Sequence, residues 1–276
     1  MRGLIPNNAA LNGATVTRPA LWNAYPQYSG ASISSVPVGR NQYHGVHLKA
    51  TKRLSHGLSF LASYSIGKNL QETRILNAQD FGGLTGFEST RLVKESNQNI
   101  DAPQKFVIAG IYELPFGKSA RGFVKQVIGG WQLNYDVTFQ SGWVVDYPNA
   151  VQNAPGSAKL PSGGQNYKRW FNTSLWKTPA GTPVPLPEPF TLRTHPYLFS
   201  DVRRPGYQNW DTSLTKLFPI KENLNLQFRF EMVNMMNHPW FTNIQSVDVN
   251  NAAFGQLNPT QGNLPRFIKL AIHLNW

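Results

Sequence analysis

The last ten residues of this 276-residue chain, FIKLAIHLNW, alternate between apolar and mixed polar side chains. Successive side chains of a β-strand point to opposite sides. One face of such a strand would therefore carry Ile268, Leu270, Ile272, Leu274 and Trp276, and the other would carry Phe267, Lys269, Ala271, His273 and Asn275. A strand of this kind suits a wall between lipid and a polar interior, and it equally suits a half-buried strand in a soluble sheet. Taken alone, the segment leaves both structures open.

The same alternation occurs in three earlier segments, residues 58–67, 131–140 and 224–233. In the last of them, apolar side chains at 224, 226, 228, 230 and 232 alternate with mainly polar ones. Three weaker segments, residues 46–51, 105–113 and 210–215, fill the gaps between the strong ones. The strong segments have the length of about 9–11 residues that a tilted membrane-spanning strand needs. The sequence therefore predicts seven strands.

The predicted connections between these strands alternate in length. Residues 54–57 and 218–223 form short links and 115–130 an intermediate one, whereas 67–104, 141–208 and 234–265 are long and rich in Gly, Pro and Asn. Loops of this length are uncommon in compact soluble domains. Short turns at one end and long loops at the other are typical of outer-membrane barrels, where the long loops are extracellular.

Aromatic residues fit the same orientation. If Trp276 lies on the periplasmic side, every short turn falls there as well. Two belts of interfacial aromatic residues are then expected. The inner belt would contain Tyr112, Trp131, Phe218 and Trp276, and the outer belt Tyr64, Phe139 and Trp210.

An odd number of strands constrains the architecture further. Bacterial single-chain barrels have an even number of strands, and an open sheet of seven would leave two unpaired edges. We therefore interpret the chain as all-β, an antiparallel meander of about seven membrane strands that forms an incomplete portion of a larger barrel.

Composition excludes several classes of protein. The chain has no cysteine, which excludes disulfides, thiolate zinc sites and cysteine nucleophiles. It has no run of about 18 apolar residues, and its first residues lack the apolar core of a signal peptide. The formal net charge is +12, but the basic residues are spread along the chain and no nucleic-acid motif occurs. We expect no nucleic-acid partner, and a basic surface can instead face anionic lipid.

We also expect no enzyme. No zinc-protease, serine-hydrolase, phosphate-loop or dinucleotide motif is present. His44 and His47 are three residues apart, which places them on opposite faces of a strand and argues against a shared metal. The sequence therefore predicts no catalytic residues, no cofactor and no metal site.

A set of short motifs resembles one family. The motifs are Asp101-Ala-Pro-Gln-Lys-Phe-Val, Tyr112-Glu-Leu-Pro-Phe-Gly, Gly129-Gly-Trp-Gln-Leu, Gln140-Ser-Gly, Arg204-Pro-Gly-Tyr-Gln-Asn-Trp-Asp-Thr-Ser-Leu, Leu226-Gln-Phe-Arg-Phe-Glu and Asn237-His-Pro. Earlier, Tyr25-Pro-Gln-Tyr and Lys52-Arg-Leu-Ser-His-Gly-Leu-Ser-Phe fit as well. As a set, in this order over residues 20–276, they resemble the TonB-dependent, Oar-like outer-membrane receptors typical of acidobacterial genomes.

The resemblance carries expectations for the whole chain. The family's barrel is expected to have 22 strands around a plug domain, and this chain would be about its last third. Residues 1–40 would be a loop-like lead-in and residues 41–276 strands and loops. The plug, the signal peptide, the TonB-contacting segment and the early strands would lie outside this chain. Expected partners are outer-membrane lipid, the missing barrel strands and plug, the TonB complex through that plug, and an unknown ligand.

Candidate site residues follow from the polar strand faces. The predicted lumen-facing residues are Asp136, Gln140, Gln227, Arg229, Glu231, Lys269 and His273. A hydrogen-bonded lining that also holds a plug is the simpler role for them, and direct ligand contact is the alternative. The loop from Trp143 to Gln208 carries Trp170, Phe171, Trp176, Tyr197 and Phe199, which either contact ligand or pack together.

Three functions remain open at this point. The first is the C-terminal barrel part of an energised receptor that imports or binds a bulky ligand. The second is a passive porin-like or structural outer-membrane protein, and the third is a secreted soluble β-sheet protein that binds carbohydrate. We further expect that the isolated chain does not fold stably in water.

Overall fold

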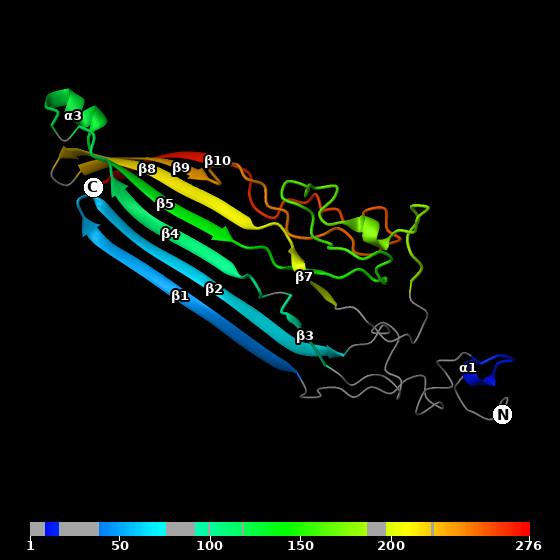
Figure 1. Cartoon of the computed structure of the whole chain (residues 1–276). Coiled ribbons are helices and arrows are strands. Elements are labelled where there is room, and N and C mark those ends of the chain that lie inside the picture. The colour runs from blue at the N-terminus through cyan, green and yellow to red at the C-terminus, as the bar shows by residue number, and fades with distance from the viewer. Residues whose placement is uncertain are drawn as a thin grey trace.

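The computed structural model describes residues 9–16, 39–75, 92–98, 100–117, 119–186, 197–221 and 224–276. Its main feature is an antiparallel meander of seven strands, each paired with the next (Figure 1). The strands are β1 (Arg40–Ser55), β2 (Leu58–Ile75), β4 (Gln104–Glu113), β5 (Trp131–Gln140), β8 (Tyr207–Lys221), β9 (Leu224–Val233) and β10 (Phe267–Asn275). The seven predicted strands and the all-β class are confirmed.

Shorter elements lie in the connections. β3 (Leu92–Ser96) pairs with the far end of β2, and β6 (Val144–Asp146) pairs with β7 (Leu198–Arg203). The helices within the described residues are α1 (Ala9–Asn12), which precedes β1, and, in the connections, α3 (Gly122–Ile128) and the 3₁₀ turn η1 (Thr173–Trp176). Among the described residues, no helix has the length and apolar character needed to cross a bilayer.

The observed register explains why alternating sequences form this sheet. Leu133, Leu214, Phe230 and Leu270 are direct neighbours across β5, β8, β9 and β10. One residue away, Asn134, Ser213, Glu231 and Lys269 form the neighbouring row. Because side chains alternate along each strand, the first row belongs to an apolar face that continues across the sheet and the second to a polar face.

Three strands are several residues longer than predicted. β1 has 16 residues against the predicted segment 46–51, β2 has 18 against 58–67, and β8 has 15 against 210–215. At the loop end of the sheet, the additional residues of β1 and β2, 40–45 and 68–75, pair with one another and with β3. Their sequence is mainly polar, so the alternation that marks a strand with one apolar face is missing there.

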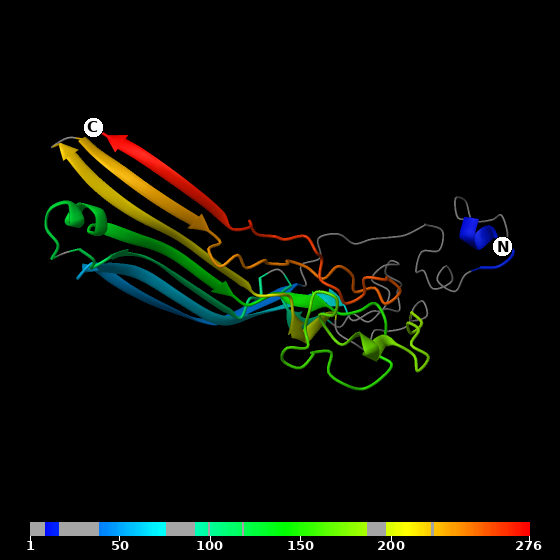
Figure 2. The same ribbon diagram turned by 90° about the horizontal axis from the view of Figure 1, so that it is seen from above.

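Turns and loops separate to opposite ends of the sheet. The links β1–β2 and β4–β5 lie at one end together with the C-terminus, and the β5–β8 and β9–β10 connections extend from the other (Figures 1 and 2). The β1–β2 hairpin closes through His56 and Gly57, both with positive φ, of 53° and 78°. Positive φ at both central residues is the type I′ geometry that fits the twist of paired strands.

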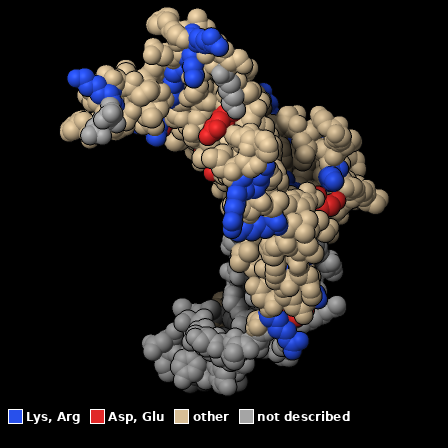
Figure 3. Space-filling model, turned by 90° about the vertical axis from the view of Figure 1, so that its left-hand side faces the viewer, with Lys and Arg blue, Asp and Glu red and all other residues tan. Residues whose placement is uncertain are grey.

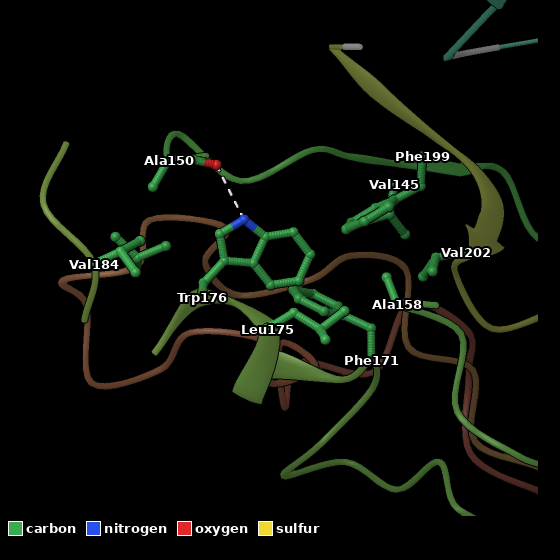
Figure 4. Close-up of a cluster of buried hydrophobic side chains, with 10 residues drawn as sticks. Val145, Ala150, Ala158, Phe171, Leu175, Trp176, Val184, Phe199 and Val202 are labelled. Atoms are coloured by element: carbon green, nitrogen blue, oxygen red, sulfur yellow. Dashed lines mark hydrogen bonds between the residues drawn. The ribbon is translucent and has the colours of Figure 1, made fainter. Parts of the chain in front are cut away.

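The buried core lies outside the sheet, in the two long connections. We define the loop module as residues 141–186, 197–206 and 234–266. Its core residues are Val145, Ala150, Ala158, Phe171, Leu175, Trp176, Val184, Phe199, Val202 and Val249 (Figure 4). The Trp176 indole is fully buried and its Nε1 donates to the Ala150 carbonyl at 3.0 Å. The module is therefore a small folded unit with its own hydrophobic core.

Candidate functional site

The polar face of the sheet carries all seven predicted lumen-facing residues. The register places Arg229, Glu231 and Gln227 of β9 opposite Ala271, Lys269 and His273 of β10. Asp136 and Gln140 lie further along the sheet, on β5. Asp136 is opposite Asp211, and Asp211 is two residues from Ser213 on the same face of β8, where Ser213 pairs with Glu231. The seven side chains therefore share one face, and their role in lining a lumen stays a prediction.

Three of these residues form a charged group. Arg229 Nη1 lies 3.1 Å from Glu231 Oε1, and Lys269 Nζ lies 3.9 Å from Glu231 Oε2. The Glu231 carboxylate is partly buried, whereas Lys269 is mainly exposed. Two cations on one carboxylate leave a local positive charge on this face, beside β10.

A second charged feature is a pair of aspartates that are direct neighbours. Asp136 on β5 and Asp211 on β8 are Cα partners, and like charges in such positions repel each other. Asp211 accepts a hydrogen bond from the backbone N–H of Asn234 at 2.8 Å, which offsets part of this cost. The candidate set above lacks Asp211, although its polar phase on β8 could have identified it.

The polar face is also hollowed. A depression of about 700 Å³ is lined by residues of β1, β2, β4, β5, β8 and β9, including Asn134, Asp136, Asp211, Ser213 and Glu231. The molecule seen from the turn end is curved, as Figure 3 shows. This arrangement provides a broad polar surface with both signs of charge rather than a narrow catalytic cleft. Among the described residues, no group of three His, Asp or Glu side chains could hold a metal ion.

A buried ionic junction connects the sheet to the loop module. Asp101 is 1% exposed, and its carboxylate accepts from Lys68 Nζ at 2.9 Å, Arg203 Nη2 at 2.7 Å and the Asn69 N–H at 2.8 Å. Arg203 Nη1 also donates to the Asp101 and Gly142 carbonyl oxygens. Burial opposes ionisation, but the bonds from Arg203, Asn69 and Lys68 outweigh it and lower the pKa of Asp101. The sequence indicated only a motif beginning at Asp101, because its partners are distant along the chain.

The aromatic residues of the long loop pack together. Phe171 and Trp176 are completely buried in the core of the loop module, Phe199 is almost completely buried there, and Trp170 is partly buried against it. Tyr197 is buried in a second cluster with Val144 and Leu198. Trp170 Nε1 donates to the Arg203 carbonyl at 2.6 Å. Of the two roles considered for this group, packing is therefore the one that the structure supports.

The opposite face of the sheet is apolar and exposed. All five predicted membrane-facing residues of the closing segment are exposed, at 52% for Ile268, 66% for Leu270, 68% for Ile272, 49% for Leu274 and 91% for Trp276. At the loop end of this face, Phe139 stacks on Phe106 and contacts Trp210 edge-on, with ring centroids 6.4 and 5.8 Å apart. At the turn end, Trp131 contacts Phe228 edge-on at 6.0 Å.

Comparison with protein families decides between a lipid-facing wall and a soluble sheet. The family model described as outer membrane beta barrel domain matches residues 3–269 of the chain. The chain belongs to the outer membrane beta barrel domain family. No curated protein matches it.

Membership in the outer membrane beta barrel domain family places the protein in the outer membrane. In such barrels the apolar strand face contacts lipid, and aromatic residues gather at the two interfaces. The exposed apolar face and its aromatic ends agree with this arrangement. The alternative of a secreted, soluble β-sheet protein disagrees with membership in this family.

The barrel is not closed within the described residues. β1 and β10 are the two ends of the strand order and do not pair with each other. A closed wall of this family would therefore need further strands, from another part of a longer chain or from another molecule.

Proposed function

We propose that the chain is the C-terminal barrel segment of a TonB-dependent, Oar-like outer-membrane receptor that takes up or binds a bulky ligand. The observation that carries this proposal is the folded loop module above an open seven-strand wall. Narrow eight-stranded barrels fill their interior with side chains, whereas 22-stranded transporters surround a plug. A wall with a broad polar face and unpaired edges suits the wide class.

The motif set supports the same assignment. Six of its motifs contain the start or the end of a strand, including the motifs with Glu113 at the end of β4, Trp131 at the start of β5 and Gln140 at the end of β5. Asp101, the first residue of another motif, forms the junction between sheet and loops. The motifs that resemble the receptor family therefore include strand ends and the buried junction of this fold.

In this proposal, the polar face contacts the plug and the loop module contacts ligand outside the cell. Energy would arrive from the TonB complex through the plug, so this chain would not bind TonB itself. We propose no catalytic step and no nucleic-acid contact.

A passive porin-like or structural protein is the second candidate. The salt bridges Arg229–Glu231 and Lys269–Glu231 would line an aqueous channel as readily as they would hold a plug. No observation favours this candidate over the receptor.

The test that separates the two is the genomic reading frame of the complete protein. A plug domain and further strands encoded upstream and in frame would support the receptor. Further strands without any plug would favour the passive protein and overturn the receptor proposal. Detergent partitioning and a heat-dependent gel-mobility shift of the complete protein would check the barrel itself.

A further inference from the structure

The β4–β5 connection, residues 114–130, carries a helix with no buried residue. α3 contains Phe123, Val124, Val127 and Ile128, exposed at 78, 55, 46 and 43%, and Phe116 before it is 62% exposed. This turn is at the end of the sheet that holds the short links and the C-terminus (Figure 1). Exposed apolar side chains that gather in one patch commonly mark a surface that contacts another molecule or a membrane.

Two donors from the apolar face of the sheet hold this helix. Trp131 Nε1 donates to the Val127 carbonyl at 3.0 Å, and Lys216 Nζ donates to the same oxygen at 2.9 Å and to the Gly129 carbonyl. Trp131 and Lys216 are Cα partners, in the same phase as Leu133 and Leu214. The C-terminal end of α3 is therefore fixed to the face that contacts lipid.

Lys216 is unusual because it is a charged residue on the apolar face. Its side chain lies over the rings of Trp131 and Phe218, with Nζ 5.2 and 4.9 Å from the ring centroids, and only 3% of the residue is exposed. A cation near the last carbonyls of a helix is favoured by the helix dipole. The lysine thus has a clear role as the attachment point of α3.

The charge of the connection is also one-sided. Its sequence from Phe116 to Gly130, FGKSARGFVKQVIGG, contains three basic residues and no acidic one. Arg121 and Lys125 are exposed. The turn end shows far more blue than red in Figure 3. Exposed apolar side chains beside exposed cations are the composition of a segment that lies in the head-group region of a membrane.

A hollow completes the site. A cavity of about 570 Å³ between α3 and the strand ends is lined by aromatic, basic and acidic side chains, namely Phe116, Trp131, Phe218, Lys125, Lys216 and Glu113, among others. Its aromatic walls would fit an acyl chain, and Lys125, which lines the cavity and is exposed, would fit a phosphate.

We propose that the β4–β5 connection binds anionic phospholipid of the leaflet on the turn side. Phe116, Trp131 and Phe218 contact the acyl region, and Arg121 and Lys125 contact the phosphate. The occupant is lipid because the site continues the lipid-facing surface and carries the opposite charge to anionic head groups. This inference rests on the family assignment and not on the receptor proposal.

The chain lacks cysteine, so a single introduced cysteine can carry an environment-sensitive fluorophore. We would label Phe123→Cys in the complete barrel protein that contains this chain, with any cysteine outside this chain replaced, folded into phosphatidylcholine vesicles with and without phosphatidylglycerol. Ile272→Cys on the apolar face and Ser162→Cys in the exposed part of the loop module are the reference positions. Quenching by lipids that carry a spin label at the head group or deep in the acyl chain reports depth.

The label at 123 should be quenched mainly from the head-group region, and phosphatidylglycerol should increase the quenching. The double variant Arg121→Gln, Lys125→Gln should remove this increase, whereas the matched variant Lys159→Gln, Lys168→Gln in the loop module should keep it. A label at 123 as accessible to water as the label at 162, while 272 lies in lipid, would overturn the proposal. An increase that survives in the double variant would overturn the phosphate contact, and a label at 272 in water would overturn the lipid placement itself.

Discussion

An arginine at Ile272 is the sharpest test of which face of the sheet contacts lipid. Ile272 lies on β10, one residue from its central position Ala271, and is 68% exposed on the apolar face. Its neighbour His273 has the opposite phase and is opposite Gln227 on the polar face. The two positions therefore differ in the face that they occupy far more than in their depth.

The geometry of the strand gives the magnitude. A strand rises about 3.4 Å per residue, so at a tilt of about 45° each residue moves about 2.4 Å along the membrane normal. Ile272 is then about 2.4 Å from the middle of an apolar band about 25 Å tall. Arginine at the midplane of the lipid face costs about 2–4 kcal/mol. Trp276, five residues from the strand centre, falls about 12 Å away, at the edge of the band, where aromatic residues are expected.

The assay is reversible unfolding in guanidinium of the complete barrel protein that contains this chain, folded into phosphatidylcholine vesicles and followed by tryptophan emission. Ile272→Arg should lower the free energy of unfolding by about 2–4 kcal/mol. The matched variant His273→Arg should change it by about 0.5 kcal/mol or less, as surface substitutions commonly do. Equal losses for the two variants, or a larger loss for His273→Arg, would refute the assigned faces.

Three further outcomes are expected. Trp176→Ala should destabilise the loop module by about 3–5 kcal/mol because it empties a fully buried site, measured as faster cleavage of the module by protease, with the exposed Tyr167→Ala unaffected as the control. Asp101→Asn should loosen the junction with Arg203 by about 1–3 kcal/mol. Since folding lowers the pKa of Asp101, its contribution is complete above the ordinary value of 3.8 and is lost as the pH falls through the lower folded value; protease resistance of the junction should therefore decline in acid in the wild type and show no such step in Asp101→Asn. Finally, the isolated chain should show no cooperative unfolding transition in buffer without lipid or detergent, and circular dichroism showing such a transition would contradict this.

Strand positions could be read from the sequence wherever one face is apolar. Segments 131–140 and 224–233 match β5 and β9 residue for residue, because the period of two identifies both strand and face. The far ends of β1 and β2 carry no such pattern, since both faces there lie beyond the apolar band. α3 was missed because its seven residues are too few to show helical periodicity and no residue of it is buried.

Contacts between distant loops could not be read in this way. Arg203 bonds to Asp101, which is 102 residues earlier, and no local pattern encodes that pairing. The candidate polar residues were identified because strand phase alone assigns them to a face. In contrast, the packing of Phe171 and Trp176 against Phe254 depends on how two loops fold together.

The loop module joins connections on either side of the β8–β9 hairpin. Phe254 of the β9–β10 connection contacts Phe171 and Trp176 of the β5–β8 connection, with ring centroids 5.5 and 6.1 Å apart. This core packs the two connections against each other and so adds to the pairing that holds β5, β8, β9 and β10 in their native order. The core therefore links the β5–β8 and β9–β10 connections beyond the loop end of the sheet. A single proteolytic cut in either connection should leave the two fragments of the chain associated.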